Sequence, residues 1–202
     1  MRRHVLVLLA AGALGTLSAQ AAERPRFAEV GAITRTPIGW TNFCKTRPDE
    51  CKVSARPSGA RMLYLDQVLL GNLKLANDYV NGHIEPVTDL EYHKTIELWT
   101  YPAGKKGDCE DYVLLKRHLL HVVFRLPLQT LLITVVKDKN GNGHAVLTVV
   151  TTGGEYVLDN QEPAILLWAD TGYQFHKRQS QDNPNVWVEL RHPPLRVAVS
   201  RR

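Results

Sequence analysis

The sequence lacks the features of a nucleic-acid-binding protein, a repeat protein or a serine hydrolase. Its 202 residues carry a formal net charge of +5, yet they contain no run of lysine and arginine and no interleaving of basic with aromatic residues. No internal repeat occurs, and no serine lies in a Gly-x-Ser-x-Gly motif. Beyond one apolar stretch near the N-terminus, no second long apolar segment follows. The composition therefore predicts one domain with a substantial hydrophobic core and no nucleic-acid partner.

Residues 1–22 have the pattern of a cleaved export signal. Arg2 and Arg3 form a basic start, residues 5–17 are apolar, and residues 19–21 read Ala-Gln-Ala, a small-residue cleavage site. The apolar stretch is shorter than the roughly 20 residues that a membrane-spanning helix needs. We therefore predict export with cleavage of the signal, with an uncleaved inner-membrane anchor as the alternative. Loss of the signal would lower the net charge to about +3, because both arginines leave with it.

Cysteine is scarce, and its three occurrences divide into a close pair and a single residue. Cys44 and Cys51 lie in a proline-rich loop over residues 42–57, where an exported chain would join them as a disulfide. The alternative is two reduced thiols, which an oxidising compartment disfavours. Cys109 then remains free under oxidising conditions, which indicates that it is present for its reactivity.

The hydrophobic pattern predicts an α+β protein. Apolar residues recur at helical spacing over residues 61–81 and again over 108–124. A turn at residues 151–154 joins two of the expected strands as an antiparallel hairpin, and residues 162–173 are expected to be partly helical. Helices precede strands, as is typical of the α+β class. The predicted strands cover residues 131–136, 144–150, 155–159 and 186–190.

Cys109 falls at the predicted start of the second helix, in the run Gly-Asp-Cys-Glu-Asp-Tyr over residues 107–112. A thiol at a helix N-terminus faces unpaired backbone N–H groups and the positive end of the helix dipole. Both favour the thiolate over the thiol. We therefore regard Cys109 as a candidate nucleophile.

His144 and Asp159 are candidates for the base and for the group that orients it. His144 begins one strand of the predicted hairpin and Asp159 ends the other, so pairing across the turn would bring them side by side. Taken singly, a surface histidine and a strand-end carboxylate are the simpler interpretations. Together with a cysteine at a helix start, the three residues predict a Cys-His-Asp triad.

These motifs carry a family resemblance. Residues 107–112, the Gly-His-Ala-Val-Leu run at 143–147 and the Val-Leu-Asp-Asn run at 157–160 resemble the bacterial transglutaminase-like cysteine proteinases, which include LapG-type periplasmic proteases that clip surface adhesins. The resemblance extends over roughly residues 40–190. It includes four positions upstream of the cysteine, namely Asn77, Asn81, Asp89 and Trp99.

The resemblance implies a fold and a set of roles. The expected fold is a papain-like, transglutaminase-like core in which the catalytic helix packs on a small antiparallel sheet. Cys109 would be the nucleophile, His144 the general base and acid, and Asp159 the orienting group. The backbone N–H of Cys109 would be one oxyanion donor. The expected organisation is a signal at 1–22, an extended arm at 23–60, the protease domain at 61–192 and an irregular basic tail at 193–202.

Three carboxylates surround the candidate nucleophile. Asp108, Glu110 and Asp111 would oppose formation of a thiolate, because like charges raise its pKa. A divalent cation would remove that penalty, and an oxygen-only ligand set suits calcium better than zinc. LapG-type enzymes are calcium-dependent, so the resemblance also favours Ca²⁺. The alternative is that acids in a first helical turn simply interact with the dipole.

The predicted function is a periplasmic cysteine endopeptidase that acts through a thioester. The resemblance implies a surface adhesin as the protein substrate and an inner-membrane cyclic-di-GMP receptor as a partner. A stand-alone relative with another substrate is an alternative. Two further alternatives stay open: transfer of the acyl group to an amine by a transglutaminase, and a calcium-stabilised binding protein with an idle triad.

Overall fold

The structure is a computed structural model that describes residues 24–53 and 61–191. The predicted signal at 1–22 and the basic tail at 193–202 lie outside the described residues. Within those ranges, no helix is both long enough and apolar enough to cross a membrane.

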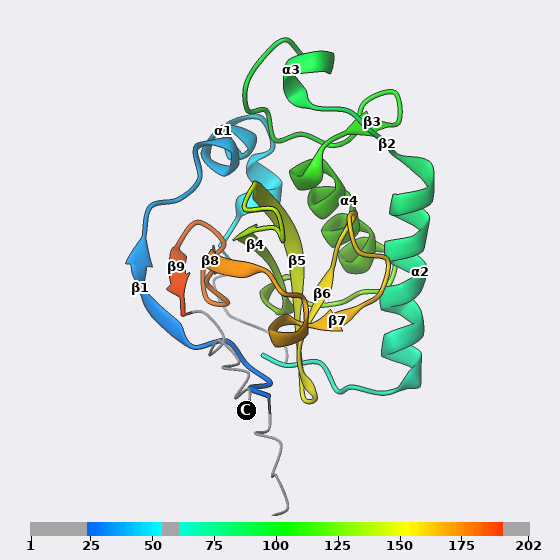
Figure 1. The fold of residues 1–202 in the computed structure, drawn as a ribbon, viewed down its shortest axis with the longest axis vertical. Helices are drawn as coiled ribbons and strands as arrows, with labels where there is room; N and C mark the ends of the chain where they lie inside the picture. Colours follow the sequence, from blue (N-terminus) through cyan, green and yellow to red (C-terminus); the bar gives the residue numbers. More distant parts are fainter. Residues whose placement is uncertain (1–23, 54–60, 192–202) are drawn as a thin grey trace, which may run out of the picture.

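One antiparallel sheet forms the centre of the fold (Figure 1). It has seven strands in the order β1-β9-β8-β4-β5-β6-β7, so it is larger than the small sheet that the sequence suggested. The class is α+β, as predicted. The strands are β1 (Val30–Thr34), β4 (Leu131–Lys137), β5 (Gly143–Thr151), β6 (Gly154–Leu158), β7 (Leu166–Leu167), β8 (Gln174–Gln179) and β9 (Trp187–Leu190).

The four predicted strands are confirmed as β4, β5, β6 and β9, and the middle two form the expected hairpin. Leu147 pairs with Leu158 and Thr151 with Gly154 across the tight turn. The strand β8 was not predicted, because its sequence Gln-Phe-His-Lys-Arg-Gln is mostly polar and no apolar run marks it. Residues 162–173, expected to be partly helical, form the short strand β7 and one 3-10 turn, Trp168–Asp170.

The helices are α1 (Ile38–Thr46), α2 (Gln67–His83), α3 (Asp89–Tyr92) and α4 (Cys109–Val122). Single 3-10 turns lie at Pro48–Cys51 and Leu128–Thr130. In Figure 1, α4 lies between α2 and strand β5, and it contacts both. The helix α2 starts later than predicted, because Asp66 caps it by accepting a hydrogen bond from Leu69 N at 2.7 Å.

The segment 23–60 is not an extended arm, because its described part belongs to the domain. The strand β1 pairs with β9 and forms one edge of the sheet. Trp40 and Phe43 of α1 are buried in the main core, where Trp40 and Trp187 each lie in edge-to-face contact with Trp99. The Cys44–Cys51 disulfide is present, with a Cα–Cα distance of 5.7 Å. A domain boundary at residue 60 is therefore wrong, since apolar burial joins both sides of it.

A small parallel pair of strands, β2 (Glu85–Pro86) and β3 (Lys106–Gly107), leads into α4. Together with α3 it lies at the N-terminal end of α4, at the top of Figure 1. Val87 N donates to Gly107 O at 3.0 Å, and Tyr112 Oη donates to Ile84 O at 2.6 Å. These bonds fix the start of α4 relative to the end of α2.

Candidate active site

Cys109 is the first residue of α4, as predicted, and it is a free cysteine, partly buried. Asp108 occupies the N-cap position in extended backbone conformation, but its side chain does not cap the helix. Asp108 Oδ2 instead accepts a hydrogen bond from the backbone N–H of Asp89 at 3.2 Å. The side chain of Asp108 therefore leaves the first-turn N–H groups of α4 uncapped.

His144 and Asp159 form a direct hydrogen bond. His144 Nε2 lies 2.7 Å from Asp159 Oδ1, and both side chains are 1% exposed. His144 lies at the start of β5, and Asp159 directly follows β6, the partner strand of β5. The hairpin thus brings together two of the three predicted catalytic residues.

Two further residues, Tyr173 and Gln161, complete the surroundings of Asp159. Tyr173 Oη donates to Asp159 Oδ2 at 2.5 Å, and its ring contacts the His144 ring edge-to-face. Gln161 N donates to Asp159 Oδ1 at 3.0 Å. Burial by itself would raise the pKa of Asp159. The hydrogen bond and charge of His144 act against burial, as do the hydrogen bonds from Tyr173 and Gln161. Together they lower the pKa of Asp159 below its usual value. We call Asp159, His144, Tyr173 and Gln161 the triad cluster.

The triad cluster also fixes which nitrogen of His144 can take a proton. Gln161 Nε2 lies 3.4 Å from His144 Nδ1. The Asp159 carboxylate, 2.7 Å from Nε2, can only accept a hydrogen bond, so the ring proton lies on Nε2 and leaves a lone pair on Nδ1. His144 Nδ1 is then the basic atom, which is the assignment that a general base needs.

The sulfur of Cys109 lies against the backbone that carries His144. The backbone N–H of Ala145, the next residue, faces the sulfur and favours its ionised form. The Sγ also lies 3.3 Å from Glu110 Oε2. Burial, followed by the carboxylate of Glu110, raises the pKa of the Cys109 thiol well above its usual value. The helix N-terminus alone therefore does not produce a thiolate in this arrangement.

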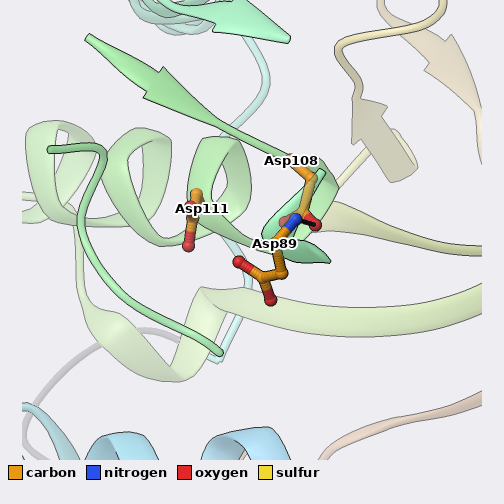
Figure 2. Close-up of side chains that lie close together, drawn as sticks. All are labelled: Asp89, Asp108 and Asp111. Carbon is orange, nitrogen blue, oxygen red and sulfur yellow. Dashed lines mark hydrogen bonds between the residues drawn. The ribbon is translucent and has the colours of Figure 1, made fainter. Parts of the chain in front are cut away.

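A second group of carboxylates lies beside the nucleophile. Asp89, Asp108 and Asp111 each offer an oxygen atom, and these atoms lie within 4.8 Å of one another. Figure 2 shows Asp111 on the first turn of α4 with Asp108 and Asp89 beside it. We call these three residues the acidic cluster. Thr100 N donates to Asp111 Oδ1 at 2.9 Å, and Leu98 N donates to Asp89 Oδ2.

The acidic cluster fits a calcium ion. In the described part of the chain, Asp108 Oδ1 and Asp111 Oδ2 are buried without a hydrogen-bond partner. Burial, together with the neighbouring carboxylates, raises the pKa of Asp111 to about 8 and also raises that of Asp89. Oxygen-only ligands at this spacing suit Ca²⁺, which would keep the carboxylates ionised.

Two of the three residues predicted to bind metal, Asp108 and Asp111, belong to the acidic cluster. Its third member is Asp89, which the sequence indicated only as part of the family pattern. Glu110 lies outside the cluster, with its carboxylate directed at Cys109. Consecutive residues of a helical turn point about 100° apart, so Glu110 and Asp111 face different sides of α4. A role for Glu110 as a ligand stays a prediction.

A family model places these motifs in a known group of enzymes. The model of the bacterial transglutaminase-like cysteine proteinases, BTLCP, matches residues 30–194, which is most of the chain. The chain belongs to this family. No curated protein sequence matches this proteinase. Solved structures do match its fold.

The solved structures similar to the proteinase include LapG of Legionella pneumophila. The calcium-bound form of LapG is 23% identical, with a TM-score of 0.51 over 62% of this chain and 71% of that chain. A second LapG structure is 22% identical, with a TM-score of 0.50 and the same coverage. The likeness shows a common transglutaminase-like fold.

Two site residues could not be found from the sequence pattern. Gln161 bonds to Asp159 two positions away, a local spacing that turns share with many loops. Tyr173 reaches Asp159 only through the return of the chain along β7 and the following 3-10 turn. Trp99, considered either for the substrate groove or for the core, is 5% exposed and belongs to the core.

Proposed function

We propose that this proteinase is an exported, calcium-dependent endopeptidase in which Cys109, His144 and Asp159 form the catalytic triad. The observation that carries the proposal is the buried His144–Asp159 hydrogen bond of 2.7 Å, next to the backbone that contacts Cys109. Membership of the cysteine proteinase family supports the reaction class. The export signal predicted from residues 1–22 supports a periplasmic location.

The reaction follows from the assigned proton positions. His144 Nδ1 removes the thiol proton of Cys109, and the Asp159 carboxylate stabilises the imidazolium that forms. The sulfur attacks the peptide carbonyl, and the backbone N–H of Cys109 donates to the oxyanion at the helix start. His144 returns the proton to the leaving amine as the C–N bond breaks. Water, deprotonated by the same nitrogen, hydrolyses the thioester.

Calcium would act through the acidic cluster. Asp89, Asp108 and Asp111 would hold the ion, which supplies positive charge beside a nucleophile whose pKa the surrounding acids raise. Asp108 and Asp111 flank Cys109 in sequence, and Asp89 bonds to the loop before α4, so the same contacts would order the start of this helix. The calcium-bound form of the similar LapG structure supports this choice of ion.

The substrate that we propose is an exported protein, and the family resemblance favours a surface adhesin. The same resemblance favours an inner-membrane cyclic-di-GMP receptor as a regulatory partner. Mass spectrometry of envelope proteins released by the wild-type strain and by a Cys109→Ala strain tests the substrate. A protein released only by the wild type, and cut at one site in vitro, supports the proposal. Equal release by both strains contradicts it.

Alkylation of Cys109 by iodoacetamide tests the site without a substrate. An activated thiol reacts near neutral pH much faster in the folded, calcium-loaded protein than in a denatured control. His144→Ala should remove the difference, while His83→Ala, at an exposed position on α2, should leave it unchanged. Incubation with a labelled amine and a glutamine donor distinguishes a hydrolase from a transglutaminase. Amine incorporation without peptide cleavage would contradict the endopeptidase.

A further inference from the structure

Lys116 is a charged residue in the core that the proposed reaction does not use. It lies on α4, seven residues after Cys109, and its side chain is 0% exposed. Its Nζ has no hydrogen-bond partner in the described part of the chain, and it lies 5.9 Å from the centre of the Tyr112 ring. A buried ammonium group is costly unless polar groups bind it, so its surroundings need an account.

Three buried amide oxygens also lack donors among the described residues. Two of them, Asn77 Oδ1 and Asn81 Oδ1, belong to α2, the helix that packs on α4. The third is Asn160 Oδ1, in the loop directly after Asp159. A lysine ammonium is a donor without acceptor capacity, whereas each of these oxygens is an acceptor. The unmatched groups are therefore chemically complementary.

The amide groups of α2 already hold the loop that carries Asp159. Asn81 Nδ2 donates to the backbone oxygen of Asp159 at 2.8 Å, and Asn77 Nδ2 donates to Pro163 O at 3.3 Å. Each asparagine thus uses its nitrogen on the loop and leaves its oxygen for another donor. Helical side chains point toward the N-terminus of their helix, so Lys116 extends toward the Cys109 end of α4, where its Nζ lies over the ring of Tyr112, one turn earlier.

We infer that Lys116 is a positioning residue for the triad: bound water links its ammonium group to the amide oxygens of Asn77, Asn81 and Asn160, since none of these atoms has a direct partner among the described residues. It thereby holds the loop after β6 so that Asp159 meets His144. This inference rests on the proposed triad. Asn77 and Asn81 would transmit the position of Lys116 to the loop, because the amide nitrogen of each donates to a backbone oxygen of the loop.

Charge supports the same arrangement. Among the described residues, Asp159 is the charged group that acts on Lys116, and it favours the protonated form of the lysine. Asp159 is also paired with His144. Tyr112 and the asparagines are uncharged. Burial, the larger effect, lowers the pKa of Lys116 to about 7. Hydrogen bonds from the ammonium group to acceptors would favour the same protonated form as Asp159 does. The loop is held while Lys116 is charged.

Lys116→Met tests the inference, because methionine fills a similar volume without the charge. We expect this variant to melt at or above the wild-type temperature, since replacing a buried charge by an apolar side chain is often stabilising. The rate of Cys109 alkylation by iodoacetamide at pH 7 should nevertheless fall by about tenfold or more, because misplaced catalytic groups lose rate steeply. Lys74→Met, at an exposed position on α2, is the matched control and should change neither quantity.

The pH profile separates positioning from a structural role. The ratio of the wild-type alkylation rate to that of Lys116→Met should be largest below the pKa of Lys116 and approach one above it. A ratio of one at every pH overturns the inference. If wild-type Cys109 reacts no faster than the denatured control, the proposed function fails instead, so the two failures are distinguishable.

Asn77→Asp provides a second test that does not require Lys116→Met to fold. A carboxylate at this buried position would pair with Lys116 and raise its pKa. The titration is followed by NMR through the ε-methylene signal of Lys116. A shift of the midpoint to higher pH supports the contact, and an unmoved midpoint overturns it.

Discussion

The triad cluster and the acidic cluster both lie near Cys109, but the protein satisfies their hydrogen-bonding groups to different degrees. Both oxygens of Asp159 accept hydrogen bonds from within the chain, and the pKa of this carboxyl group is lowered. In the acidic cluster, Asp108 and Asp111 keep buried oxygens without donors, and the pKa of Asp111 is raised to about 8. The difference indicates that the chain completes the triad cluster by itself, whereas the acidic cluster leaves oxygen atoms that a cation could accept as ligands.

The largest expected effect comes from breaking the triad cluster. His144→Ala removes the general base, and the rate of peptide cleavage should fall by roughly 10²–10⁴-fold. Cleavage of the released protein substrate, followed by gel densitometry, measures this loss. His83→Ala on the exposed end of α2 is the control, and an activity loss in both variants would contradict a specific role of His144.

Removal of calcium should affect the second region compared, the acidic cluster. Calcium at a hundred times its dissociation constant should stabilise the fold by about 2.7 kcal/mol, so a chelator should lower both the melting temperature and the activity. In the chelated protein, Asp111 has a folded pKa above its unfolded value of 3.8. The folded state then binds more protons, so the free energy of unfolding should fall as the pH rises from about 4 to 8.

With calcium bound, this fall should disappear, since the carboxylates are ionised in both states. Urea unfolding across this pH range, with calcium and with chelator, measures the difference. Identical slopes in the two series, together with an unchanged melting temperature, would show that the acidic cluster binds no ion.

Gly107→Ala sharpens the comparison, because the added Cβ directly meets Asp111 of the acidic cluster. A Cβ atom at Gly107 would lie 2.6 Å from Asp111 Oδ2 and 2.8 Å from Asp111 Cβ, so Asp111 must move. We expect calcium affinity, measured by calorimetry, to fall by roughly 10–100-fold, as for other changes next to a ligand. Gly71→Ala is the matched control, because nothing lies within 4 Å of its added Cβ. Equal calcium affinities in the two variants would contradict the site.

Tyr173→Phe has the smallest expected effect, since it removes one of several donors to Asp159. Loss of a hydrogen bond to a charged group costs about 1.5–3 kcal/mol, and we expect roughly a tenfold lower cleavage rate with a lower melting temperature. Tyr64→Phe, at an exposed position, is the control. Wild-type stability and activity in Tyr173→Phe would show that Asp159 does not depend on this contact.

Local patterns were sufficient for much of the fold and part of the site. The buried strand β4 is an apolar, β-branched run, β5 leads into a glycine-containing turn, and the start of α4 carries a glycine followed by an acid, so their positions follow from short-range chemistry. The strand β8 lacks such a pattern, and β1 was assigned to an arm. Both are strands because neighbouring strands supply hydrogen-bond partners, which a linear pattern does not contain.

The sequence by itself determined that a free cysteine begins a helix, that a histidine and an aspartate flank one hairpin, and that three acids surround the thiol. Each of these depends on neighbours a few residues away. Only the tertiary structure decided that Tyr173 donates to Asp159, that Asp89 joins the acidic cluster while Glu110 does not, and that Lys116 is fully buried. These outcomes depend on which distant segments share a desolvated space, where an unpaired polar group is costly and a matched one is fixed in place.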